Sequence, residues 1–126
     1  MNAIDMIVNF FKQGASIVYH ASGGTGAGLF KAAKDLGKLA IGVDSDQGLI
    51  YATSKSAEEK KMSEFILTSM LKRVDVAVYN VAKQHKPGLS VLGLAEGGVD
   101  YAVDEHNAKL VGADGQPVSI ELLLNG

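Results

Sequence analysis

The fold of this chain is decided by residues 15–28, which read ASIVYHASGGTGAG. The first half of this stretch is short and rich in β-branched residues, which is typical of a buried strand. The second half has four glycines in six positions and leads into an apolar run that predicts a helix over residues 29–36, ended by Gly37. A strand followed by a glycine-rich turn and a helix is the first unit of an α/β fold.

The same alternation continues on both sides of this stretch. Residues 3–13 predict an amphipathic helix that stops at Gly14, and residues 38–44 predict a second buried strand. A third strand is predicted for residues 89–95, and a Gly-Gly turn then leads into the apolar run 99–103. Strands that alternate with helices predict a mostly parallel sheet between two helix layers, a three-layer α/β/α arrangement.

The remaining segments complete a single domain over residues 1–126. Residues 45–55 are predicted to be a loop around a short apolar insert. Ser56 and Glu59 form a capping-box pattern that starts a long helix, whose apolar stripe runs from Met62 to Val81. The tail predicts a turn at Asp114-Gly115, followed by a strand or short helix over residues 118–124.

Composition excludes several classes of protein. The chain has 126 residues, with 12 basic and 14 acidic side chains, so its net charge of −2 argues against a nucleic-acid-binding module. It has no cysteine, which excludes disulfides, thiolate metal sites and a cysteine nucleophile. There is no apolar run of about 18–20 residues and no secretory signal pattern at the start. We therefore expect a soluble chain without a targeting segment.

Ligands of open parallel sheets bind beyond the carboxyl ends of the strands, which directs attention to two segments. The first, residues 19–28, contains the glycine turn, whose candidate residues are Ser22, Gly23, Gly24, Thr25 and Gly26. Its backbone N–H groups and the following helix N-terminus favour oxygen acceptors or anions, although a tight turn alone would also explain the glycines. The turn lacks both the dinucleotide fingerprint and the phosphate-loop signature.

The second segment holds two carboxylates, Asp44 and Asp46, at the end of the second strand. Such a pair can hold a hard cation or accept hydrogen bonds from the vicinal hydroxyls of a ribose. Because no third acidic ligand lies near in sequence, hydroxyl binding by Asp44 is favoured over a metal site. Asp46 is also a candidate cap for a helix or turn.

Three further side chains are candidates. Tyr19 and His20 alternate at the end of the first strand, so an aromatic ring there can stack on a planar base or belong to the core. None of the three histidines shows metal-ligand spacing. Lys72, on the predicted long helix, either belongs to a solvated face or reaches toward the cleft with its amine.

Three segments of the chain, residues 17–26, 40–47 and 67–78, together resemble the basic membrane protein family. These are bacterial substrate-binding lipoproteins, and they include the purine nucleoside receptors. The resemblance covers about residues 3–104, whereas residues 112–126 match nothing that we can place.

The resemblance implies a receptor of an ABC importer that closes two α/β lobes on a purine nucleoside. Tyr19, where the family typically has Phe, would stack on the base, and the Gly23–Gly26 turn would line the pocket. Asp44 would hold the ribose hydroxyls, and Lys72 would donate to the purine. We assign His20, Ser22, Thr25 and Asp46 to the same pocket, and we expect no catalytic residue, metal or cofactor.

The match corresponds to the carboxyl-side lobe only. We therefore expect one flavodoxin-like, periplasmic-binding-protein-like lobe, excised or re-engineered from an extracytoplasmic lipoprotein or periplasmic protein that serves an ABC permease. Such a lobe would bind nucleoside weakly or not at all, and its exposed cleft face could form a homodimer. The competing hypothesis is a flavodoxin-like or Rossmann-like enzyme, or a signalling domain, that holds a nucleotide cofactor on the 23–28 loop.

Overall fold

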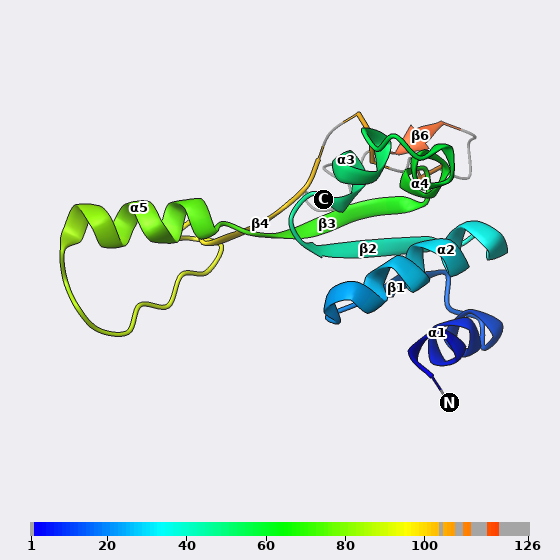
Figure 1. The fold of residues 1–126 in the computed structure, drawn as a ribbon, viewed down its shortest axis with the longest axis horizontal. Coiled ribbons are helices and arrows are strands. Elements are labelled where there is room, and N and C mark those ends of the chain that lie inside the picture. The colour runs from blue at the N-terminus through cyan, green and yellow to red at the C-terminus, as the bar shows by residue number, and fades with distance from the viewer. Residues whose placement is uncertain (1, 104, 108–109, 112–115, 119–126) are drawn as a thin grey trace.

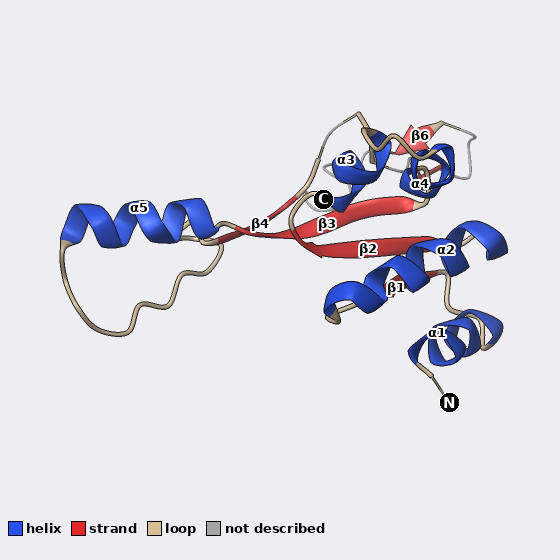
Figure 2. Ribbon diagram, viewed as in Figure 1, coloured by secondary structure: helices blue, strands red, loops and turns tan. Residues whose placement is uncertain are grey.

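The computed structural model describes residues 2–103, 105–107, 110–111 and 116–118. Helices and strands alternate along the chain (Figures 1 and 2). In order they are α1 (Ala3–Lys12), β1 (Ile17–Tyr19), the 3-10 turn η1 (Gly23–Thr25), α2 (Gly26–Leu36), β2 (Leu39–Asp44), α3 (Gln47–Ala52), α4 (Ala57–Ser63), β3 (Ile66–Lys72), α5 (Val74–Gln84), β4 (Val99–Tyr101), β5 (Leu110–Val111) and β6 (Pro117–Val118).

Four of the strands form one sheet in the order β1-β2-β3-β4. β1 pairs with β2 and β2 with β3 in parallel, whereas β4 runs antiparallel to β3. The register of β2 against β3 shifts by one residue between Ala40 and Ile41. The predicted α/β class with a mostly parallel sheet is therefore confirmed. A separate antiparallel pair is formed by β5 and β6.

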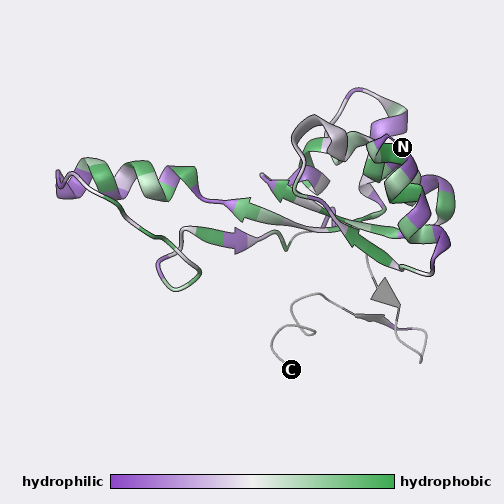
Figure 3. Ribbon diagram, turned by 90° about the horizontal axis from the view of Figure 1, so that it is seen from below, coloured by the Kyte–Doolittle hydropathy of each residue, from purple (hydrophilic) through white to green (hydrophobic). Residues whose placement is uncertain are grey.

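The core lies between one face of this sheet and four helices. Because β1, β2 and β3 follow one another in space, right-handed crossovers place α2, α3 and α4 on the same face. The ring of Phe30 on α2 meets that of Tyr51 on α3 edge-on at 5.1 Å, and α1 joins the same core through Ile7 and Phe11. Figure 3 shows these helices gathered on one side of the strands.

The opposite face of the sheet is half-exposed at β1, whereas residues Ile66–Ser69 of β3 are buried on both faces. Val18 packs against the core, so its neighbours Ile17 and Tyr19 point to the other side, where they are 41% and 50% exposed. β1 is thus a half-exposed edge strand rather than the fully buried strand that its sequence predicted. The second helix layer expected for a three-layer arrangement is not among the described residues.

The predicted long helix after Ser56 is wrong. The Ser56 cap itself is confirmed, because its hydroxyl accepts the Glu59 N–H at 3.4 Å. The helix that follows ends at Ser63, however, and residues 66–72 form β3 in the middle of the sheet. A short apolar run fits a helix stripe and a buried strand equally well, and here pairing with β2 and β4 on both sides decides for the strand.

Two further element predictions are also wrong. Residues 47–52 form α3 rather than a loop, with the Asp46 carboxylate accepting the Leu49 N–H at 3.0 Å as its N-cap. Residues 89–95 form a loop rather than a strand; within it, Glu96 accepts the Gly93 N–H at 2.8 Å. The predicted turn at 114–115 lies outside the described residues, as does the segment 118–124 apart from Val118 in β6.

Helix α5 stands away from this body on an arm made by β3 and β4 (Figure 1). None of its residues is buried. Its apolar side chains Val74, Val78 and Val81 are 56–63% exposed, and Leu89 in the loop that follows is 94% exposed. The stability of the domain therefore comes from the core of β1–β3 and α1–α4, with little contribution from α5.

This division predicts different outcomes for two alanine substitutions. Leu29→Ala removes a side chain with no exposed surface, so we expect a loss of about 2–5 kcal/mol in the free energy of unfolding. Val78→Ala should change that free energy by less than about 0.5 kcal/mol. Urea unfolding followed by circular dichroism measures both. If Val78→Ala lowered the free energy of unfolding as much as Leu29→Ala, the conclusion that α5 contributes little to stability would be wrong.

Candidate functional site

Three predicted site residues stand at the carboxyl ends of adjacent parallel strands. Tyr19 ends β1, Asp44 ends β2 and Lys72 ends β3. Asp44 lies opposite Leu71 in the register, which places the next residue, Lys72, within reach, and its amine lies 3.1 Å from the Asp44 carboxylate. The prediction that put Lys72 on a helix is wrong, but the strand places it beside Asp44.

Both partners of this ion pair face solvent. The side chains of Asp44 and Lys72 are 57% and 60% exposed. An exposed pair of this kind contributes little to stability, about 0–1 kcal/mol, because water and salt screen it. A polar ligand could therefore take over either partner at a small cost. The pair presents an acceptor and a donor side by side at the edge of the sheet.

The backbone at Asp44 has an unusual conformation. Its φ is +69°, in the left-handed region that side chains other than glycine rarely adopt. On one side of it the Val43 N–H donates to the Gln47 amide oxygen at 2.8 Å, and on the other the Ser45 N–H donates to the Val43 carbonyl at 2.9 Å. Such conformations persist where neighbours hold them, and they are concentrated at binding sites.

Gln47 and Ser69, which the sequence analysis did not select, support the end of β2. The Gln47 N–H donates to the hydroxyl of Ser69, a residue with no exposed surface, at 3.0 Å. A Cβ at Gly42 would lie 2.6 Å from that hydroxyl and 2.7 Å from the Gln47 amide oxygen, so glycine is required between them. The only sequence signal for this network is the position of Gln47, directly after a strand end and a capping aspartate.

The predicted glycine turn lies at the same edge of the sheet. Ser22, Gly23 and Gly24 are exposed, and the η1 turn leads directly into α2. Thr25 caps α2 without a side-chain hydrogen bond. The first N–H groups of a helix carry a partial positive charge, so this turn can receive oxygen acceptors.

The side chains of the remaining candidates, Tyr19, Asp46 and His20, differ in how far they are exposed to solvent and in what they contact. Tyr19 is half-exposed, so its ring is accessible, as stacking on a ligand would require. Asp46 uses one carboxylate oxygen as the cap of α3, the alternative noted from the sequence. His20 is only 6% exposed and lies beneath Gly26, so its ring faces the interior rather than an open surface.

Several ionisable groups near this edge have shifted pKa values. Burial lowers the pKa of His20, and this effect outweighs the opposing influence of Gln47 and Asp44. Arg73, the residue after Lys72, hydrogen-bonds Asp75 at 2.8 Å and lowers the pKa of that carboxyl to about 2. Asp75 therefore stays ionised at any physiological pH.

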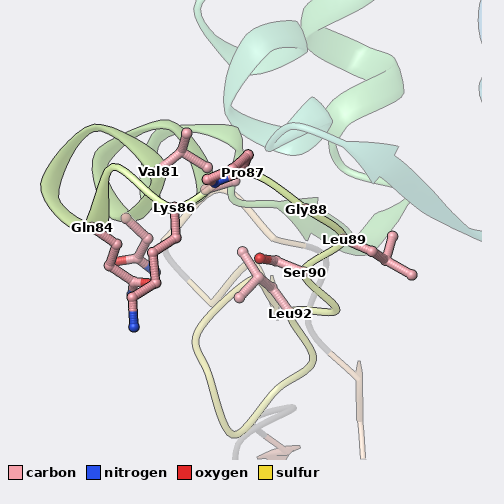
Figure 4. Close-up of a pocket in the computed structure, with 10 residues that line it drawn as sticks. Val81, Gln84, Lys86, Pro87, Gly88, Leu89, Ser90 and Leu92 are labelled. Atoms are coloured by element: carbon pink, nitrogen blue, oxygen red, sulfur yellow. The ribbon is translucent and has the colours of Figure 1, made fainter.

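A separate pocket lies on the arm. It has a volume of about 480 Å³ and is lined by α5 and the loop that follows it (Figure 4). Its lining residues are Ala77, Asn80, Val81, Gln84, Lys86, Pro87, Gly88, Leu89, Ser90 and Leu92. None of the predicted site residues is among them.

The described part of the chain contains neither a cluster of metal ligands nor a membrane-spanning helix. No three histidine or carboxylate side chains in this part of the chain come together as potential metal ligands. None of the helices described is long and apolar enough to cross a bilayer.

A parallel sheet with polar side chains and a glycine turn at its carboxyl edge is the arrangement of α/β domains that bind small molecules. Comparison with known families defines the class further. The Bmp family, described as ABC transporter substrate-binding protein PnrA-like, matches residues 3–116. The chain belongs to this family.

Several individual proteins are similar to the chain. The ABC transporter nucleoside-binding protein BmpA of Lactococcus lactis is 31% identical over 114 residues, covering 79% of this chain and 32% of the relative. A CD4+ T-cell-stimulating antigen of Listeria monocytogenes is 39% identical over 88 residues, covering 64% and 24%. Basic membrane protein D of Borreliella burgdorferi is 29% identical over 107 residues, covering 78% and 28%. The chain thus spans about a quarter to a third of the length of these relatives.

The close approach of Gly26 to His20 yields a test of this edge of the sheet. A Cβ at Gly26 would lie 2.3–2.5 Å from the His20 ring, whereas one at Gly24 would meet nothing within 4 Å. We expect Gly26→Ala to lower the free energy of unfolding by about 1–3 kcal/mol, because the buried ring must shift. Urea unfolding measures the loss.

Gly24→Ala is the matched control, and we expect it to leave stability within about 0.5 kcal/mol of the parent. Alanine is the better helix former, so Gly26→Ala would stabilise α2 if the contact with His20 were absent. Equal or higher stability for Gly26→Ala would therefore overturn the placement of His20.

Proposed function

We propose that this chain is the ligand-binding edge of a substrate-binding protein that recognises purine nucleosides for import by an ABC transporter. The observation that carries the proposal is the ion pair between the Asp44 carboxylate and the Lys72 amine, 3.1 Å apart. The exposed Tyr19 ends β1, the strand next to the one that Asp44 ends. The Lactococcus lactis relative is named as a nucleoside-binding protein, which supports the choice of ligand.

The side chains present fit the parts of a nucleoside. Tyr19 offers a ring face on which a planar base stacks. Asp44 accepts hydrogen bonds from the ribose hydroxyls, and Lys72 donates to an acceptor on the purine. The exposed backbone of Ser22, Gly23 and Gly24 closes the site from the first strand. Thr25, Gly26, Asp46 and His20 complete the proposed site. Thr25 and Gly26 stand at the start of α2, Asp46 caps α3, and His20 is buried under Gly26.

A ligand on this edge is desolvated from one side only. Association costs several kcal/mol of translational and rotational freedom whatever the number of contacts. A ligand contacted from one side therefore has a much less favourable net free energy of binding than a ligand contacted from two sides. We propose that this chain alone binds nucleoside with a dissociation constant of about 1 mM or weaker, equivalent to about −4 kcal/mol.

The family supports a proposal for the rest of the transport system. We propose that the longer protein is an extracytoplasmic lipoprotein or periplasmic protein that delivers its nucleoside to an ABC permease. We also propose that a second copy of the chain covers the open edge from the other side of the ligand, giving a homodimer through that face. Size-exclusion chromatography with light scattering, with and without inosine, distinguishes this dimer from a monomer.

Calorimetric titration with inosine, guanosine and adenosine tests the proposed ligand. We expect weak binding that Asp44→Asn reduces about tenfold or more, the loss of one to two hydrogen bonds to a charged acceptor. Asp35→Asn is the matched control, because Asp35 is an exposed carboxylate that forms its ion pair within α2, with Lys31. Tyr19→Phe should retain binding and Tyr19→Ala should lose it.

Three results would count against the proposal. Tight binding by a proven monomer would contradict the argument from a one-sided site. Equal affinities for the Asp44→Asn and Asp35→Asn variants would show that the ligand does not bind at the end of β2. Thermal protection by a nucleotide but not by a nucleoside would favour the competing hypothesis of a nucleotide cofactor.

A further inference from the structure

His20 lies inside the molecule, under the turn that the proposed function uses. It is 6% exposed, and its ring meets the Phe30 ring edge-on at 5.5 Å. Gly26, the first residue of α2, passes so close above the ring that a Cβ there would overlap it. The imidazole is therefore packed directly against the start of α2.

The hydrogen bonds of the imidazole fix its tautomer. Nδ1 accepts the backbone N–H of Ser22, with 3.4 Å between the two nitrogens. An accepting Nδ1 carries no proton, so the proton of the neutral ring is on Nε2. Nε2 is buried and makes no hydrogen bond of normal geometry with the described residues. The ring thus holds the turn through a single bond, and this bond requires the neutral form.

We propose that His20 is a positioning residue that couples proton uptake to the shape of the 22–25 turn. A proton from water that binds Nδ1 turns this atom from an acceptor into a donor. It then faces another donor, the Ser22 N–H, so the hydrogen bond breaks and the turn is released. The effect on ligand affinity rests on the proposed function, whereas the effect on the turn does not.

The charged and polar groups around His20 set the pH at which this happens. Asp44 from β2 and the Gln47 amide from α3 favour the protonated ring, and Asp44 is itself paired with Lys72. α2 contributes only Phe30 and Gly26, which are uncharged. Burial disfavours the charged ring more strongly, which lowers the pKa of His20 from its usual value.

The direction of the pH effect follows from linkage. A histidine whose pKa is lower in the folded state takes up its proton more readily in the unfolded state. Folding stability from this group is therefore fully present above about pH 6.5, and it is lost as the pH falls through the folded-state pKa. The turn should be ordered at neutral pH and released in acid.

Nuclear magnetic resonance of the whole chain between pH 8 and pH 5 tests the proposal. His85 and His106 are replaced by Gln, so that His20 is the remaining imidazole. We expect the Ser22, Gly23 and Gly24 amide signals to shift with the same midpoint as the His20 ring, at a pH below about 6.5. Turn signals that stay unchanged while His20 titrates would overturn the proposal, as would a midpoint above 6.5.

A non-titrating variant provides the matched control. In His20→Asn the side-chain oxygen can accept the Ser22 N–H but takes up no proton in this range, so the turn signals should become independent of pH. If this variant does not fold, the titration of the parent chain still decides the question.

Inosine affinity measured at pH 7.5 and pH 5.5 separates this inference from the proposed function. We expect the affinity to fall at least threefold in acid for the parent chain and to stay constant for His20→Asn. Turn signals that titrate with His20 but no inosine binding at either pH would refute the proposed function alone. Inosine binding with no titration of the turn would refute the role of His20 alone.

Discussion

The parallel pairing of β1, β2 and β3 is the constraint on which the rest of the structure depends. Parallel strands end at the same edge, so residues far apart in the sequence are brought together there. The register of β2 against β3 places Asp44 opposite Leu71 and so brings Lys72 to within 3.1 Å of the Asp44 carboxylate. A slip of one residue would turn these side chains to the other face of the sheet.

Much of the fold was predictable from local signals. Glycines after strands and helices, together with short β-branched runs, indicated α1, β1, α2 and β2 close to their observed bounds. The predictions were wrong where several readings fitted the same apolar run. Residues 66–72 fit the stripe of a helix, and only their position between β2 and β4 makes them a strand. Residues 89–95 have the composition of a strand but pair with no neighbouring strand.

The candidate site was predictable to a similar degree. The rule of strand ends directed attention to Tyr19, the glycine turn and Asp44, and in the structure these residues lie at the ends of β1 and β2. It could not show that His20 faces inward, which depends on how α2 packs over the end of β1. Nor could it show that Gln47 supports the end of β2, because the pairing of β2 with β3 brings Ser69 to Gln47. The proximity of Lys72 to Asp44 likewise followed from strand pairing, which the periodicity of the sequence had concealed.

The central claim is that the ends of three neighbouring strands form one nucleoside site. It is tested most directly by following every backbone amide by nuclear magnetic resonance while inosine is added to the unmodified chain. The account predicts that the amides of Tyr19, Ser22, Gly24, Asp44 and Lys72 shift together with one common dissociation constant, while those of α5 stay unchanged. Shifts confined to the arm pocket, or different dissociation constants at the different strand ends, would contradict it.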